Sequence, residues 1–263
     1  MSTVPQATLS EAVVSVSNKR SSAAPTSRRG DDQFFLAMAV FILGTVFLGF
    51  ARTFYLAGIY HTHLPNRLIA VHGTVFTAWV VLLVVQTGLV AGRRISVHRA
   101  LGLFGAALAA SMVILGLAAA TDSLARGFAP PSFPFGSLTF YATPVFAMIT
   151  FATLIAAGLW MRSNGPAHKR LVLLATITLL PAAIGRWPFA VMSRVHFIVN
   201  VIVFLFVLLV AAFDLWSLRR IHPATMRGGI FLTLMVNLAI PVGTTSAWQR
   251  FAGLALRFWQ GSH

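Results

Sequence analysis

Long apolar segments separated by short polar turns dominate this chain. Seven of them are long enough to cross a bilayer, which takes roughly 20 helical residues. They cover residues 34–57, 68–91, 98–120, 138–162, 170–186, 195–218 and 228–247. The fifth is short and contains Pro181, so the pattern defines its end less sharply. We therefore predict an all-α integral membrane protein with seven transmembrane helices over residues 34–247.

The two ends of the chain have a different pattern. Residues 1–33 are poor in hydrophobic side chains and rich in Ser, Thr, Ala and Arg, which predicts a disordered cytoplasmic tail. The first apolar segment is too long for the core of a cleaved signal peptide, so we expect no cleavage there. Residues 248–263 alternate aromatic side chains with Arg250 and Arg257, which predicts an amphipathic tail on the membrane surface.

Composition supports lipid as the main surrounding of the chain. It is 57% hydrophobic and 10% charged, with a formal charge of +15. In a soluble protein that charge would suggest nucleic acid, but the basic residues here cluster in short turns between apolar segments, so we expect no nucleic-acid partner. The chain has no cysteine, which excludes disulfides and thiolate-bound metals.

The distribution of basic residues predicts the orientation. If the N-terminus is cytoplasmic, the cytoplasmic segments carry Lys19, Arg20, Arg28, Arg29, Arg93, Arg94, Arg99, Arg162, Lys169, Arg170, Arg219, Arg220 and Arg227. The outer segments then carry Arg52, Arg67, Arg126, Arg186, Arg194, Arg250 and Arg257. This excess follows the positive-inside rule, so we predict a bacterial inner membrane protein with its N-terminus cytoplasmic and its C-terminus outside.

A weak internal repeat runs through the chain. An offset of 124 residues places His72 on His196 and His98 on His222, and an offset of 70 places His98 on His168. Helices two to seven would then be three copies of one hairpin, following an extra first helix. Low identity leaves coincidence as the alternative.

The histidines of the helices divide into two levels. His72 and His196 lie near the outer surface, with His61 and His63 on the adjoining loop. His98, His168 and His222 lie at the cytoplasmic ends of helices. About 29 Å of helix separates His72 from the level of His98, so these two cannot share a ligand.

Polar residues also align along individual helices. His72, Trp79 and Gln86 are seven residues apart and form one stripe, and His196, Asn200 and Asp214 share a face of the sixth segment. Asp214 is the one carboxylate inside a predicted span. Facing lipid would cost several kcal/mol, so we expect both stripes to face the bundle interior.

Haem ligation is the favoured interpretation of these histidines. Two neutral imidazoles on facing helices at equal depth suit a b-type haem. Propionates could then be bound by cations at the outer level, namely Arg52, Arg186 and Arg194, or at the inner level, namely Arg99, Lys169 and Arg170. The alternative is that the histidines form ordinary hydrogen bonds between helices.

One short string adds a resemblance. The segment His98-Arg99-Ala100-Leu101-Gly102, at the start of a helix, resembles one in small, mostly uncharacterised bacterial multi-span proteins. The two-level layout is similar to that of b-type membrane cytochromes with two haems. The resemblance implies haem b on an outer pair, His72 and His196, and an inner pair, His98 and His168. It also implies electron transfer with a quinone or another redox partner. The seven spans and the extra His222 depart from that pattern.

Other functions remain open at this point. A copper or other metal could bind His61, His63 and His72, or the three inner histidines, because three imidazoles suit copper or zinc. A carrier could use the outer arginines and the polar stripes. A non-catalytic subunit of a membrane complex is the remaining alternative. Neither lysine lies in the middle of a span, which argues against a retinal Schiff base, and we find no set of residues for hydrolase or kinase chemistry.

Overall fold

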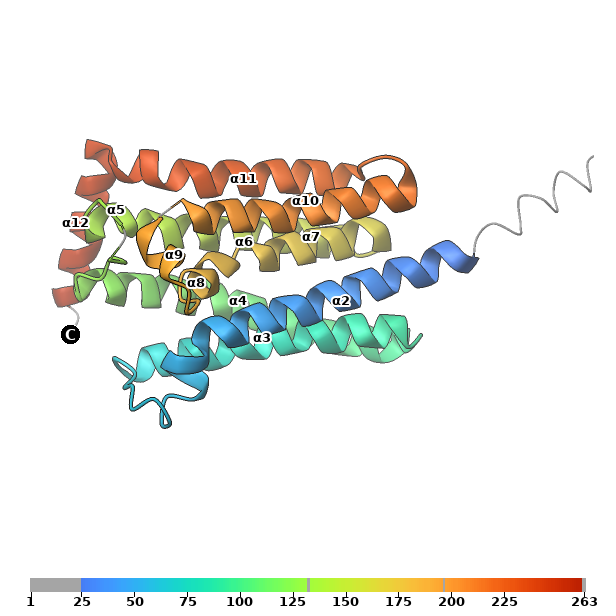
Figure 1. Ribbon diagram of the computed structural model, residues 1–263, viewed down its shortest axis with the longest axis horizontal. Coiled ribbons are helices and arrows are strands. Elements are labelled where there is room, and N and C mark those ends of the chain that lie inside the picture. The colour runs from blue at the N-terminus through green and yellow to red at the C-terminus, as the bar shows by residue number, and fades with distance from the viewer. Residues whose placement is uncertain (1–24, 132, 196, 262–263) are drawn as a thin grey trace, which may run out of the picture.

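The protein is a bundle of long helices. The computed structural model describes residues 25–131, 133–195 and 197–261, and within them seven helical segments are long and apolar enough to cross a membrane. No strand occurs in these ranges. The predicted all-α membrane fold is therefore confirmed (Figure 1).

The helices follow one another with short connections. In chain order they are α2 (Pro25–Phe50), the π-helical turn η1 (Ala51–Tyr55), α3 (Arg67–Ala91), α4 (Ile95–Ala125), α5 (Ser137–Phe140), α6 (Ala142–Trp160), α7 (Gly165–Ile177), α8 (Leu180–Ile184), α9 (Ala190–Arg194), α10 (Ile198–Leu218), α11 (Pro223–Gly243) and α12 (Ser246–Gly261). The first helix begins earlier than predicted, since α2 starts at Pro25 and its membrane span at Arg29. Residues 1–24, the rest of the predicted tail, lie outside the described part.

The fifth span is the central helix of the bundle. α7 contacts α2, α6, α10 and α11, and it reaches α3 and α4 through side chains. This span is 67% buried, against 17–44% for the other six among the described residues. Its position explains its moderate hydropathy, because a helix shielded from lipid can carry polar residues that pair with its neighbours. The predicted span 170–186 was placed too late, since the helix begins at Gly165.

Local sequence signals set the ends of this central helix. The side chain of Asn164 accepts a hydrogen bond from the backbone N–H of Ala167 at 3.3 Å and caps α7, and Pro166 occupies the first turn. At the other end Pro181 cannot donate a helical hydrogen bond, and the chain breaks into the short helix α8. α8 lies against α2, where Gly49 meets the backbone of Ala183.

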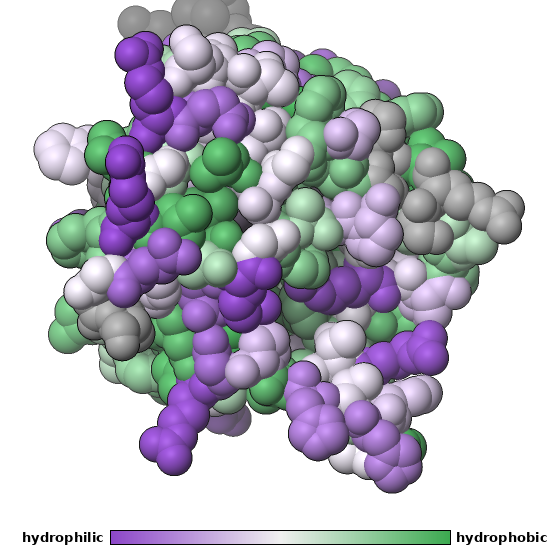
Figure 2. Space-filling model, turned by 90° about the vertical axis from the view of Figure 1, so that its left-hand side faces the viewer, coloured by the Kyte–Doolittle hydropathy of each residue, from purple (hydrophilic) through white to green (hydrophobic). Residues whose placement is uncertain are grey.

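The bundle has two polar ends, which we name by the end of the described chain, Pro25 or Gly261, that lies nearest. The N-terminal face holds the start of α2 and the turns at 92–94, 161–164 and 219–222. The C-terminal face holds the 56–66 loop, the 126–131 segment and α12, which runs across the ends of the other helices (Figure 1). Polar side chains are spread over this face in Figure 2. On α12, Phe251 and Phe258 are exposed beside Arg250 and Arg257.

Candidate functional site

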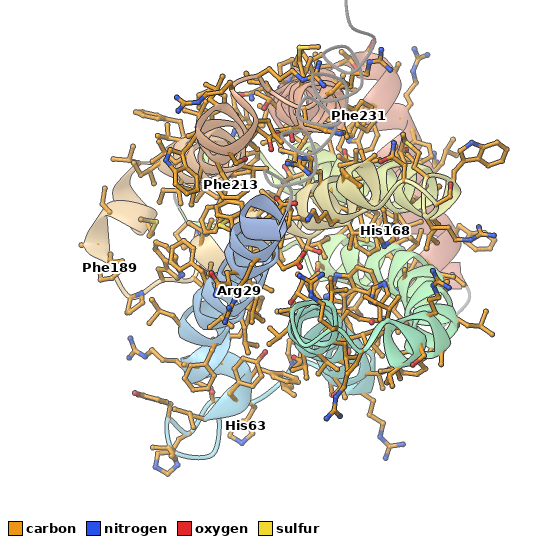
Figure 3. All side chains as sticks on the ribbon, turned by 90° about the vertical axis from the view of Figure 1, so that its right-hand side faces the viewer. Arg29, His63, His168, Phe189, Phe213 and Phe231 are labelled. Atoms are coloured by element: carbon orange, nitrogen blue, oxygen red, sulfur yellow. The ribbon has the colours of Figure 1, made fainter. Side chains whose placement is uncertain are left out.

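Two of the predicted inner histidines meet at the N-terminal face. His98, in the first turn of α4, and His168, in the first turn of α7, have ring centroids 6.4 Å apart and ring planes at 79°. Figure 3 shows His168 between α7 and α4. The residues are 70 positions apart in the chain, so the bundle brings together the pair that the sequence suggested.

One ring of the pair has a fixed orientation. His168 Nδ1 lies 2.8 Å from the carbonyl oxygen of Gly158 on α6. A carbonyl only accepts, so Nδ1 carries the proton, and in the neutral ring Nε2 keeps its lone pair free for a ligand. Metal-binding histidines commonly show this arrangement, in which the second nitrogen donates to a backbone carbonyl.

The other ring has an unused polar atom. His98 Nδ1 is buried and has no hydrogen-bond partner, and the same is true of Oε1 of Gln86, at the end of α3. The backbone of Gln86 lies near the His98 ring, but no hydrogen bond of ordinary geometry joins it to Nδ1. Buried polar atoms without partners are rare in folded proteins and call for an explanation such as a bound ligand or ion.

His222 is not part of this pair. Its Nδ1 accepts a hydrogen bond from the backbone N–H of Ala224 at 3.1 Å, which caps α11. The described residues contain no group of three or more histidines or carboxylates that could hold a metal ion. The predicted inner set of three is therefore a pair plus a helix cap. His222 lies outside the spans, and burial followed by the Arg170 charge lowers its pKa.

A buried ion pair lies next to the histidines. Arg170, two residues after His168, donates from Nε to Oδ1 of Asp214 on α10 at 2.9 Å, and its Nη1 donates to the carbonyl of Pro166 at 2.9 Å. The other carboxylate oxygen, Oδ2, accepts from the Thr225 hydroxyl at 2.6 Å and from the backbone N–H of His222 at 3.1 Å. Asp214 therefore holds α7, α10 and α11 together.

The ion pair extends to the start of α2. Lys169 pairs with Asp31, and its Nζ lies 3.7 Å from Oδ1 of Asp32. It also lies 4.7 Å above the ring of Phe35. Lys169 and Arg170, predicted as cations for propionates, thus have carboxylate partners from the protein. Sequence reasoning missed these contacts, although a single carboxylate in a span is itself a signal that a cation must face it.

At the outer level the structure describes one member of the predicted pair. The ring of His72 packs on Phe76 at 4.0 Å, and its buried Nδ1 has no partner. His196 and the side chain of Arg194 lie outside the described part of the chain, so their pairing with His72 stays a prediction. The stripe of His72 does face inward, because Trp79 donates to the hydroxyl of Thr176 on α7 at 3.1 Å.

The remaining predicted residues lie on the C-terminal face. His61 and His63 are both exposed on the 56–66 loop. Arg52 lies 5.2 Å from the ring centroid of Tyr60. Arg186 lies 5.0 Å from that of Phe50, and it donates to the carbonyl of Ala182 at 2.6 Å.

The spacing of the inner pair suits two imidazoles on one metal centre. Two metal–nitrogen bonds of about 2.0–2.1 Å place the nitrogens about 4 Å apart, and the ring centres then lie roughly 6 Å apart. The separation of 6.4 Å between His98 and His168 is close to that value. A Cβ added at Gly102, one turn after His98, would meet no atom within 4 Å, so there is free space beside this glycine. The donor set of two imidazoles fits an imidazole-bound cofactor.

Comparisons with known proteins give no related protein for this chain. No protein-family model, curated protein or solved structure matches the chain. The functional argument therefore depends on the geometry of the site.

Proposed function

We propose that this polytopic membrane protein binds a b-type haem through His98 and His168 and transfers electrons. The observation that carries the proposal is the placement of two imidazoles from different helices at ligand spacing, one with its Nδ1–H held by the Gly158 carbonyl and the other with a buried, unpartnered nitrogen. When bound, such a haem supplies one-electron transfer.

The surrounding residues have separate tasks in this proposal. The carbonyl of Gly158 fixes the tautomer of His168, so that Nε2 keeps the lone pair that a ligand bond needs. Gly102 leaves room beside the pair. Arg99 is exposed at the N-terminal face, where it can bind a carboxylate, whereas Lys169 and Arg170 are already paired. Electrons would come from a quinone or a small reductant.

Absorption spectra test the haem. The protein is purified in mild detergent, and a reduced-minus-oxidised spectrum is recorded. We expect a b-type spectrum that is lost or changed to five-coordinate in His98→Ala and in His168→Ala, with the matched control His63→Ala unchanged. The haem-to-protein ratio is measured for each variant, and its thermal unfolding midpoint shows whether a loss of haem reflects a loss of fold. A colourless wild-type protein, or a spectrum unaffected by either variant, would contradict the proposal.

A copper ion is the second candidate, because two imidazoles alone form a sufficient donor pair for it. The same preparation distinguishes the two. Elemental analysis that finds copper in place of iron, lost in His98→Ala and retained in His63→Ala, would favour copper. His72 with His196 remains the proposed outer pair, and a second haem would appear as a stoichiometry of two that falls in His72→Ala.

We also propose a bacterial inner membrane location with the N-terminal face in the cytoplasm. The turns of that face carry most of the exposed arginines outside the spans, among them Arg93, Arg94, Arg219 and Arg220. Because the chain has no cysteine, single-cysteine variants report sidedness directly. In intact cells an impermeant maleimide should label His63→Cys and leave Arg94→Cys unlabelled. The reverse pattern would overturn the orientation.

A further inference from the structure

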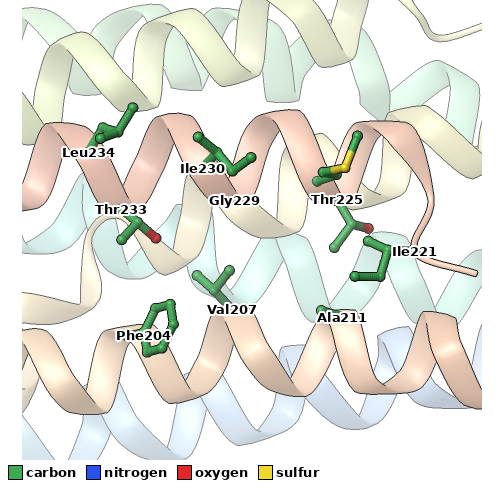
Figure 4. A pocket seen from close by; sticks show the side chains of 10 residues that line it. Phe204, Val207, Ala211, Ile221, Thr225, Gly229, Ile230, Thr233 and Leu234 are labelled. Carbon is green, nitrogen blue, oxygen red and sulfur yellow. The ribbon is translucent and has the colours of Figure 1, made fainter.

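A groove lies on the outside of the bundle between α10 and α11. It has a volume of about 370 Å³ and an almost wholly apolar lining (Figure 4). Its rim is formed by side chains that point away from the bundle, including Phe204, 44% exposed, and Ile230, 56% exposed. In a membrane this surface faces lipid. It is separate from the histidine pair, which lies between α4 and α7.

Small residues form the floor of the groove. Ala211 on α10 and Gly229 on α11 both line it. A Cβ at Gly229 would lie 2.9 Å from Cγ1 of Val207, so the glycine allows the helices to meet below the groove while their larger side chains diverge above it. Along α11 the lining runs from Thr225 to Leu234, about 13 Å of helix. A groove of this shape accepts a flexible, unbranched chain.

Arginines lie at one end of the groove. Ile221, in the turn between the two helices, and Met226 line that end. Arg219 and Arg220 belong to the same turn, and Arg227 follows Met226 on α11; all three are exposed. Of the carboxylates near this turn, Asp214 is buried and already bonded to Arg170 and Thr225, and Asp31 pairs with Lys169. The arginines thus form a cationic end to an apolar groove.

We propose that this groove binds one anionic phospholipid, with an acyl chain between α10 and α11 and the phosphate at Arg219, Arg220 and Arg227. Charge complementarity selects this occupant, because a phosphate on an acyl chain matches a cationic end on an apolar groove. A neutral isoprenoid would offer no anionic group to bind these arginines. The Thr225 hydroxyl of the lining already donates to Asp214, which leaves Thr233 as the one hydroxyl of the lining available to a neutral headgroup.

Lipid binding to the purified full-length protein tests the proposal. Native mass spectrometry would compare phosphatidylglycerol with phosphatidylcholine of identical acyl chains. We expect tighter binding of phosphatidylglycerol. Ala211→Leu fills the groove and should weaken that binding roughly tenfold, from the methylene groups displaced. The matched control is Ala212→Leu, the same change at an exposed neighbour outside the lining, which should have no effect.

A second set of measurements tests the headgroup site with two variants that each remove three positive charges. Arg219→Gly with Arg220→Gln and Arg227→Gln should weaken phosphatidylglycerol binding about fivefold per arginine and weaken binding of phosphatidylcholine, whose headgroup has no net charge, much less. The control is Arg93→Gly with Arg94→Gln and Arg162→Gln at the same end of the bundle. Arg93 and Arg219 both have a left-handed backbone, with φ of 60° and 58°, so glycine is tolerated at each.

Several results would overturn the proposal. If Ala211→Leu and Ala212→Leu changed phosphatidylglycerol binding equally, the groove would not be the binding site. If the two arginine sets changed it equally, Arg219, Arg220 and Arg227 would not bind the headgroup. Binding that depends on Ala211 but not on headgroup charge, and that is displaced by an isoprenoid quinone, would assign the groove to a neutral ligand. The thermal unfolding midpoint of each variant in detergent is measured first, so that a folding defect is recognised.

Discussion

Arg170 of α7 and Asp214 of α10 form an ion pair in the centre of the bundle, with side chains only 1% and 0% exposed. The carboxylate uses both oxygens, and the guanidinium also donates to a backbone carbonyl. Charges removed from water in this way are tolerated when every hydrogen-bonding position is satisfied. This pair is next to His168, so it also fixes the first turn of the helix that presents the candidate ligand.

Neutralising Asp214 should destabilise the protein strongly. Asp214→Asn keeps a side chain of the same size, but it removes the hydrogen-bonded counter-ion of buried Arg170 and leaves only Asp31, which lies 3.8 Å away and is shared with Lys169. Loss of one partner of a buried pair costs about 3–5 kcal/mol. We expect a clear fall in the thermal unfolding midpoint in detergent, followed by circular dichroism.

The control for this change is Asp122→Asn. Asp122 pairs with Arg126 at 2.9 Å, but the Arg126 side chain is 36% exposed and can be rehydrated. A pair of this kind contributes roughly 0–1 kcal/mol. The amide oxygen that replaces the carboxylate can still accept the hydrogen bond from Nδ2 of Asn66, so the control should unfold almost as the wild type does. A similar fall of the unfolding midpoint in the two variants would mean that the buried Arg170–Asp214 pair stabilises the protein no more than the partly exposed Asp122–Arg126 pair does.

The position of His222 predicts a pH-dependent stability. Burial, and then the positive charge of Arg170, lowers the pKa of this imidazole below its ordinary value of about 6.5. A lowered histidine pKa means that the unfolded state binds more protons between the two values, so stability falls as the pH drops below about 6.5. Protonation would also remove the Nδ1 lone pair that caps α11.

The variant that tests this is His222→Asn. Asparagine is an effective helix N-cap that does not titrate, so it retains the bond to the Ala224 N–H while removing the proton. Unfolding midpoints measured from pH 7.5 to 5 should fall less steeply in the variant than in the wild type. Other groups titrate equally in both proteins, so the difference reports His222. Parallel curves would show that this imidazole is not protonated on unfolding.

The sequence predicted the membrane fold well, because spans are defined by the length of an apolar segment alone. It also predicted that His98 and His168 share a level, since both start a helix after a basic turn. It misjudged what surrounds them. Arg170 looks like one more basic residue of a cytoplasmic turn, and only the central position of α7 turns it inward, to Asp214. Which helix lies in the centre depends on packing between distant segments, and no local pattern encodes that.

The predicted repeat illustrates the same limit. The turns after α3 and α10 both contain two consecutive arginines, and the first of each pair, Arg93 and Arg219, has φ near 60°. These turns therefore share a left-handed arginine, although Arg93 follows the C-cap Gly92 of α3 and Arg219 is itself the C-cap of α10. The histidines that the repeat aligned, His98 and His222, nevertheless differ in their contacts, because His98 faces His168 and His222 caps its own helix. Equivalent positions in a hairpin do not guarantee equivalent neighbours.

The close contact between α2 and α8 predicts that Gly49 does not tolerate a larger side chain. A Cβ added at Gly49 would lie 2.2 Å from the carbonyl oxygen and 2.8 Å from the Cα of Ala183. These are backbone atoms that cannot rotate aside, so Gly49→Ala must push α2 away from α8, at a cost of about 1–3 kcal/mol or more. Gly44→Ala on the same helix is the matched control, since its Cβ would meet nothing within 4 Å. Alanine is the better helix former by up to about 1 kcal/mol, so the control should unfold at the wild-type temperature or above it. Thermal unfolding in detergent would separate the two variants, and equal midpoints would mean that the helices are not in backbone contact at Gly49.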